Sequence, residues 1–215
     1  MKSLRSRVSE FFRRPYGVCT PLNIYMFAPS RLIAHLKTAI ADPRYFVNRI
    51  RVIEYQLLHP SEPWLTKEAL RAIKRFVAPD MRAFEWGSGK STLWLAAHVA
   101  EVVSVEHDAA WYARVRSMLA EAGARNTDLR MADVMAYAAQ ISSFPDNFFD
   151  FVLIDGADRN GCIRAAATKV RPGGWIVVDN ADSAWDYSPL ANYQRTVTHN
   201  GVWQTDIFIR SAAKP

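Results

Sequence analysis

Short apolar segments alternate with segments of helical periodicity over residues 81–215, and this alternation constrains the fold more than any other feature. The segments expected to be strands are 81–86, 101–106, 128–131, 148–154, 175–178 and one or two within 202–210. The segments expected to be helices are 91–99, 109–122, 137–141, 162–170 and 193–198. Strands alternating with helices predict an α/β fold, with a parallel sheet covered on both faces. Ligands of such sheets bind beyond the carboxyl ends of the strands.

Residues 1–80 differ from the rest of the chain in charge and pattern. They hold 14 Lys and Arg against 6 Asp and Glu, whereas residues 81–215 hold 13 against 15. The first part therefore carries a net charge of +8 and the second a net charge of −2. Helices are expected at 3–14, 30–40 and 45–58 and after an N-cap at Thr66, with Leu70, Ile73, Phe76 and Val77 on the buried face of the last one. We expect a basic helical extension over 1–80 and a second domain over 81–215.

The basic extension suggests several partners. A basic surface at one end of a chain can dock on nucleic acid. The amphipathic segment 3–14 could lie on an anionic membrane, or pack on its own domain or on a partner chain, including a second copy of this chain.

Composition excludes several classes of protein. Cys19 and Cys162 are far apart and outside any CxxC pair, so neither a disulfide scaffold nor a zinc module is expected, and a cytoplasmic location fits best. No apolar run has the length of a membrane span, and the N-terminus lacks the pattern of a secretory signal.

The segment FEWGSGKST (84–92) contains a glycine turn that has two interpretations. The residues Gly89-Lys90-Ser91-Thr92 suggest a phosphate-binding P-loop. That motif, however, needs a glycine at the position where this chain has Phe84. The alternative is a tight turn at Gly87 and Gly89 that lets the backbone approach a ligand. Three acids support the second interpretation: Glu85, Glu106 and Asp133 each lie at the end of an expected strand. They would repel a pyrophosphate and suit a cationic nucleoside without phosphates, such as S-adenosylmethionine.

At these residues the chain resembles the class I S-adenosylmethionine-dependent methyltransferases, and within them the O-methyltransferases. The resemblance covers about residues 62–210. It rests on FEWGSGKST (84–92), VVSVEHD (102–108), ADV (132–134), FDFVLIDG (149–156) and VRPGGWIVVDN (170–180).

The resemblance implies a Rossmann-like, seven-stranded, mostly parallel sheet with one antiparallel strand near the C-terminus. It implies S-adenosylmethionine as cofactor, with the ribose at Glu106, the adenine near Asp133 and the methionine part between Gly87 and Gly89. Trp64 could border the pocket. The full implied set is Glu85, Gly87, Ser88, Gly89, Ser91, Glu106, His107, Asp133, Val134 and Asp155.

The resemblance also bears on the acceptor. Methyltransferases that act on amino groups of nucleic acid bases carry an Asn/Asp-Pro-Pro-aromatic stretch after the fourth strand. This chain has Asp155-Gly156-Ala157-Asp158 there, without prolines, so such an acceptor is disfavoured. In catechol-type O-methyltransferases, the residues at the positions of Asp155, Asp179 and Asn180 bind a divalent cation. The resemblance therefore implies Mg²⁺ at these three residues, because Mg²⁺ prefers oxygen ligands. This chain departs from that pattern, because Asp158 stands where the family has a basic lysine. The alternative for Asp179 and Asn180 is a strand-end turn with Asn in a special backbone conformation.

Without a metal, Asp155 or Asp158 could be the general base, helped by their mutual proximity, with His107 and His199 as alternatives. Residues 182–187 are expected to form a lid or wall of the acceptor pocket.

The sequence therefore predicts O-methylation of a small molecule, sugar or glycan. One alternative is an RNA- or protein-directed methyltransferase that docks through its basic extension. The other is an inactive interaction module, which the acids at 85, 106, 133 and 155 disfavour.

Overall fold

A computed structural model of the chain describes residues 40, 42–181 and 183–212. These residues separate into two compact units. One contains α4 (Pro43–Leu58), which begins one residue after Asp42, whose carboxylate caps it by accepting from Arg44 N at 3.0 Å. The helices expected at 3–14 and over 30–39 lie outside the described residues.

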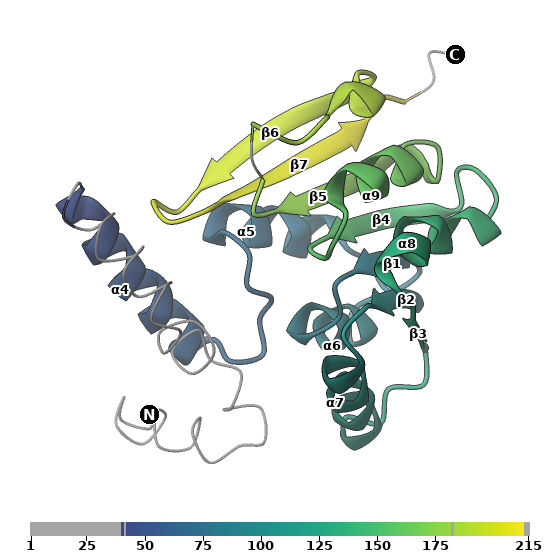
Figure 1. Cartoon of the computed structure of the whole chain (residues 1–215), viewed down its shortest axis with the longest axis horizontal. Coiled ribbons are helices and arrows are strands. Elements are labelled where there is room, and N and C mark those ends of the chain that lie inside the picture. Colours follow the sequence, from purple (N-terminus) through teal and green to yellow (C-terminus); the bar gives the residue numbers. More distant parts are fainter. Residues whose placement is uncertain (1–39, 41, 182, 213–215) are drawn as a thin grey trace. The chain divides into compact units, whose positions relative to one another are not determined.

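The second unit, from Pro63 onward except for 200–202, contains one seven-stranded sheet (Figure 1). Its strands are β1 (Arg82–Trp86), β2 (Glu101–Glu106), β3 (Thr127–Met131), β4 (Phe149–Ile154), β5 (Val170–Asp179), β6 (Tyr193–His199) and β7 (Gln204–Arg210). The spatial order is β3-β2-β1-β4-β5-β7-β6. Strands β1 to β5 are parallel, and β7 is antiparallel to both of its neighbours. The expected Rossmann-like, mostly parallel sheet is confirmed.

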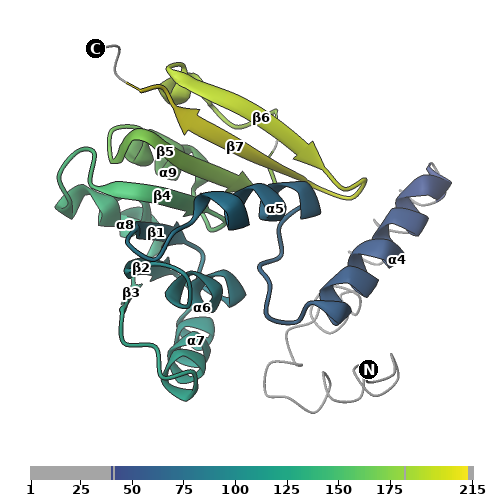
Figure 2. The same cartoon turned by 180° about the vertical axis from the view of Figure 1, so that it is seen from behind.

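Helices cover both faces of this sheet, as the views from opposite sides show (Figures 1 and 2). The helical elements are α5 (Lys67–Phe76), α6 (Lys90–Ala96), α7 (Ala109–Glu121), α8 (Val134–Tyr137), α9 (Arg159–Ala166) and the 3₁₀ segments Ala138–Ser143 and Ser188–Leu190. On one face, residues of α8 and α9 pack on the alternate strand residues Phe84, Trp86, Val152 and Ile154. On the other face, α5 and α6 pack on Ala83, Phe151 and Leu153.

Helix α5 belongs with the sheet, although the sequence grouped it with the basic extension. Its buried face holds Leu70 and Ile73, and the Phe76 ring stacks on Trp175 with centroids 4.2 Å apart. The compact unit accordingly begins at Pro63, whereas the sequence placed the boundary at residue 80.

Two expected elements differ from the structure. Residues 193–198, expected to be helical, lie in the edge strand β6, whose aromatic and β-branched residues suit a strand paired along β7. Strand β5 begins at Val170 and includes Gly173, with φ of +77°, where the register against β4 shifts. Among the described residues, no helix is long and apolar enough to span a bilayer.

Candidate functional site

The turn after β1 brings the carboxyl ends of β1 and β4 into contact. Gly87 has φ of +93°, a conformation that glycine adopts at low cost. A Cβ at Gly87 would lie 2.5 Å from the backbone oxygen of Asp155. A Cβ at Gly89 would meet only the Trp111 ring, at 3.8 Å, and Trp111 Nε1 donates to the Ser88 carbonyl at 2.7 Å. The turn is therefore closely packed against β4 at Gly87 and roomier at Gly89.

Glu85 is fully buried beneath this turn, on the face that α6 covers. Its Oε2 accepts from the hydroxyls of Thr92 and Ser104, the latter at 2.7 Å. Burial raises the pKa of Glu85 to about 7, and hydrogen bonds from Ser91, Thr92 and Ser104 offset part of that rise. Glu85 thus supports the turn from inside the fold, and Ser91 contributes to the same group.

Glu106, at the end of β2, holds the glycine turn through its carboxylate. Oε2 accepts from the backbone N of Ser88 at 3.1 Å and from its hydroxyl at 2.9 Å. Oε1 accepts from the backbone N of His107 and Asp108 at 2.8 and 2.9 Å, and His107 Nδ1 lies 3.1 Å away. These four donors fill the roughly four acceptor positions of a carboxylate, so a ligand hydroxyl could bind Glu106 only in place of the rotatable Ser88 hydroxyl.

The carboxyl end of β3 presents an exposed apolar surface. Asp133 caps α8 by accepting from the backbone N of Met135 and Ala136 at 2.9 and 3.0 Å. Around it, the exposed fractions of Met131, Val134 and Met135 are 44%, 48% and 95%. An exposed apolar surface beside a carboxylate suits the flat face and the amino group of adenine. Trp64 lies beside the start of α6, after the glycine turn, with the Lys90 ammonium 5.0 Å from its ring centroid.

Asp155 and Arg159 form an ion pair after β4, with 3.1 Å between Oδ1 and Nη2. Burial raises the pKa of Asp155 to about 6, although 34% of its side chain is exposed; Arg159 lowers the pKa and Glu106 raises it. The carboxylate can therefore accept a proton near neutral pH while it stays accessible to a ligand.

The other candidate bases have different surroundings. Asp158 is exposed, has φ of +44°, and caps α9 by accepting from Gly161 N at 3.1 Å. The His107 ring packs edge-on against Tyr137 at 5.5 Å. His199 ends β6, in register with Gln204. The neighbouring carboxylate that raises the pKa of Asp155 is that of Glu106. The sequence had suggested that Asp158 would have this effect.

Asp179, at the end of β5, belongs to a buried polar network. Its Oδ1 accepts from the Thr205 hydroxyl at 2.6 Å, and Thr205 Oγ1 accepts from the backbone N of Thr66 at 3.1 Å. The hydroxyls of Thr66 and Thr198 are in contact, and Thr198 also donates to the Thr205 carbonyl at 2.7 Å. Burial and the nearby Asp155 raise the pKa of Asp179 above its usual range.

The oxygens proposed for Mg²⁺ do not fit a divalent cation as they are placed. Arg159 donates to Asp155 Oδ1, to the Gly156 carbonyl and, at 3.1 Å, to the Asp179 carbonyl. Asn180 has φ of +48°, as the turn interpretation expected, and its carbonyl accepts from Trp185 Nε1 at 3.3 Å. No group of three or more acidic, His or Cys side chains in the described part of the chain could hold a metal ion.

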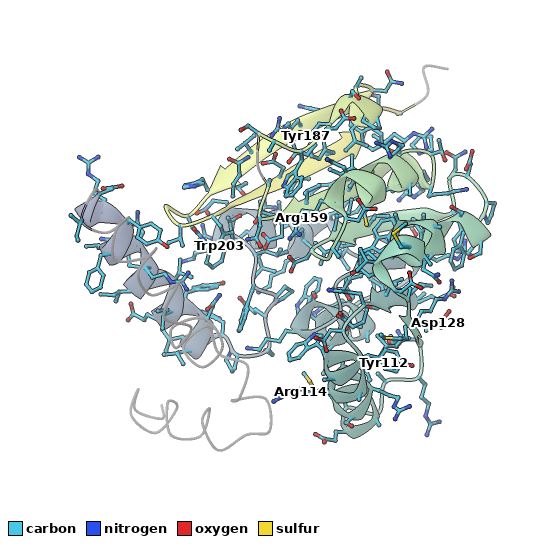
Figure 3. The ribbon with its side chains drawn as sticks, in the orientation of Figure 1. Tyr112, Arg114, Asp128, Arg159, Tyr187 and Trp203 are labelled. Atoms are coloured by element: carbon cyan, nitrogen blue, oxygen red, sulfur yellow. The ribbon has the colours of Figure 1, made fainter. Side chains whose placement is uncertain are left out.

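The connection after β5 covers this edge of the sheet. Trp185 lies over Arg159, with the guanidinium carbon 5.9 Å from the ring centroid (Figure 3 labels Arg159 on α9). Tyr187 stacks on Phe208 at 5.1 Å, and the Arg195 guanidinium lies 4.4 Å from the Tyr187 ring centroid. Residues 183–187 are therefore held against the sheet, while Asp182 lies outside the described residues.

Sequence reasoning missed three features of the site. It assigned no contact to Arg159, although the four-residue spacing from Asp155 was a signal. It gave no role to Trp111 over the glycine turn or to Thr205 beside Asp179. Trp111 and Thr205 carry no local motif, because their partners are distant in the sequence.

A family model described as a methyltransferase domain matches residues 84–181. No curated protein matches the chain.

Several solved structures are similar. A precorrin-6y C5,15-methyltransferase from Geobacter metallireducens is 18% identical with a TM-score of 0.55, covering 69% of this chain and 90% of its own. The O-methyltransferase TomG from Streptomyces achromogenes, solved with S-adenosylmethionine, is 20% identical with a TM-score of 0.52, covering 66% and 77%. A precorrin 8w decarboxylase from Methanobacterium thermoautotrophicum is 18% identical with a TM-score of 0.54, covering 71% and 95%.

At these identities the solved structures establish the fold alone. The family match covers all four strand ends that carry Glu85, Glu106, Asp133 and Asp155. The match over residues 84–181, together with the geometry of the glycine turn, shows that this part of the chain is similar to a methyltransferase domain.

Proposed function

We propose that the chain methylates a hydroxyl group of a small molecule, sugar or glycan. The observation that carries this proposal is the position of Asp155. Its backbone contacts Gly87, in the turn where the resemblance puts the methionine part of the cofactor. Its carboxylate is partly exposed and titrates near neutral pH. A carboxylate so placed suits an acceptor that must lose a proton as it attacks.

The residues of the site fit S-adenosylmethionine. Glu106 ends β2, and Asp133 and Asp155 follow β3 and β4, which favours a cationic ligand. The turn at Gly89 leaves room beside Trp111. Glu106 would hold the ribose, and the apolar surface at Val134 would hold the adenine. When bound, the cofactor supplies an electrophilic methyl group, whose bond to sulfur breaks with both electrons remaining on the sulfur.

The protein's part in the reaction is to orient the acceptor and move a proton. The site would orient the acceptor hydroxyl beside the Asp155 carboxylate, and Asp155 would accept the proton that this hydroxyl loses on methylation. Trp185 limits access of water from the side of the acceptor. The aromatic ring also suits the apolar face of a sugar or of a ring compound.

A transfer assay with isotopically labelled S-adenosylmethionine and a panel of hydroxyl compounds tests the proposal. We expect a methyl ether in the product, identified by mass spectrometry and NMR. Recovery of the label only on nitrogen or carbon, or only on RNA or protein, would contradict it.

Asp155→Asn tests the assigned base. Wild-type kcat/KM should rise with pH to a plateau, with a midpoint near pH 6, because the basic form of Asp155 is required. Asp155→Asn should lose at least about a hundredfold in kcat together with this titration. Asp158→Asn should keep both, since Asp158 caps α9 and asparagine suits its backbone conformation. If Asp158→Asn, and not Asp155→Asn, loses the pH dependence of kcat/KM, then Asp158 is the general base.

A further inference from the structure

The Arg159 guanidinium lies among the oxygens at the carboxyl ends of β4 and β5. Nη2 donates to Asp155 Oδ1 and Nε to the Asp179 carbonyl, both at 3.1 Å, and Nη1 donates to the Gly156 carbonyl. Only 16% of the Arg159 side chain is exposed. These contacts fix a positive charge at the edge of the sheet where the acceptor is proposed to bind.

The same oxygens are the donors that a divalent cation would need. A cation at this position would have to displace Arg159 or share Asp155 with it at close range, against like-charge repulsion. Asp179 Oδ1 is also occupied, by the Thr205 hydroxyl. The donor set is therefore already satisfied by a cation that belongs to the chain.

Arg159 still has capacity to bind a ligand. A guanidinium carries five N–H groups, and its contacts with the described residues use three of them. The Trp185 ring lies on one side of the guanidinium, so a ligand bound there would meet both the ring and the remaining N–H groups. The guanidinium of arginine stays charged in proteins, with a pKa above about 12.

We propose that Arg159 supplies the positive charge that a divalent cation supplies in catechol-type O-methyltransferases. It holds the Asp155 carboxylate toward the acceptor, and its free N–H groups bind the acceptor oxygen as negative charge develops on it. The acceptor is then an oxygen nucleophile that needs no chelating pair of oxygens. This inference rests on the proposed O-methylation.

The first experiment measures metal binding and needs no acceptor. Wild-type protein is titrated with Mn²⁺ and followed by electron paramagnetic resonance, beside Asp155→Asn. We expect no Mn²⁺ site that depends on Asp155, and we expect methyl transfer to be unchanged in EDTA. A Mn²⁺ site that Asp155→Asn abolishes, or transfer that EDTA stops and Mg²⁺ restores, would overturn the proposal.

The second experiment removes the charge. Arg159→Ala should lower kcat/KM about a hundredfold, mainly through kcat, which is the usual effect of losing one donor to a developing oxyanion. Arg164→Gln, an exposed arginine on the same helix, is the matched control and should keep wild-type rates. Thermal unfolding of both variants establishes that they are folded.

Chemical rescue separates a role for the charge from a role in folding. Guanidinium chloride, far below denaturing concentrations, should restore part of the Arg159→Ala rate, whereas urea, which is planar but neutral, should not. Arg159→Lys should retain more activity than Arg159→Ala because it keeps the charge. Equal rates for Arg159→Ala and wild type, or a folded Arg159→Ala that neither guanidinium nor the lysine variant improves, would refute the inference.

The outcomes distinguish the two proposals. If the wild-type protein methylates nitrogen only, the proposed function fails, whatever the Mn²⁺ titration gives. If it methylates hydroxyls but requires an Asp155-bound metal, the proposed function stands and the role of Arg159 fails.

Discussion

Glu85 makes the stability of this protein depend on pH, and the dependence can be isolated with one substitution. The carboxyl group is completely buried, and burial raises its pKa from 4.5 to about 7. Glu85→Gln keeps an oxygen that can accept from Thr92 and Ser104 but removes the titration. The variant therefore changes the charge of the site with little change in its shape.

The sign and size of the effect follow from proton linkage. Between pH 4.5 and about 7 the folded protein binds more protons at Glu85 than the unfolded chain does, so its stability falls as the pH rises. The favourable difference is fully present below pH 4.5 and is lost as the pH passes the folded pKa. Integrated from pH 5 to pH 8, the loss of stability from this one group is about 2–3 kcal/mol.

Urea unfolding at pH 5 and pH 8, followed by circular dichroism, measures this loss. The wild-type free energy of unfolding should fall between the two pH values by about 2–3 kcal/mol more than that of Glu85→Gln. Other buried acids titrate in both proteins, so their contribution cancels in the comparison. Glu101→Gln, at the exposed start of β2, should behave as wild type. If Glu85→Gln and wild type lose the same free energy, Glu85 is not the buried titrating group inferred here.

Further predictions concern the cofactor and the glycine turn. Glu106→Gln should weaken S-adenosylmethionine binding at least about tenfold by isothermal titration, because it removes a charge and an acceptor from the proposed ribose site. Glu101→Gln should keep the wild-type affinity, and equal affinities for wild type and Glu106→Gln would show that Glu106 does not hold the ribose. Gly87→Ala should destabilise the protein by about 2 kcal/mol more than Gly123→Ala. Both glycines have positive φ, but a Cβ would strike the backbone of Asp155 only at Gly87; equal losses in thermal unfolding would show that the close approach carries no cost.

Local patterns were enough to predict most of the sheet. Strand β2 lies where the sequence placed it, at Glu101–Glu106, and β1 and β4 differ from the prediction by one residue at one end. These strands are mostly apolar because both faces of the sheet are covered, so they can be recognised without knowledge of a distant partner. Edge strand β6 has a mostly exposed burial pattern, and only its pairing with β7 distinguishes it from a helix.

The sequence by itself determined that acids follow successive strands around a glycine turn, because strand ends and glycines are local features. It left the metal ligands and the general base open. The tertiary structure brought Arg159 onto the oxygens of Asp155, Gly156 and Asp179, and it left Asp158 exposed as a helix cap. These contacts depend on the conformations of the turns after β4 and β5. Arg159 and Asp179, which the contact joins, are 20 positions apart in the sequence, so no local pattern predicts it.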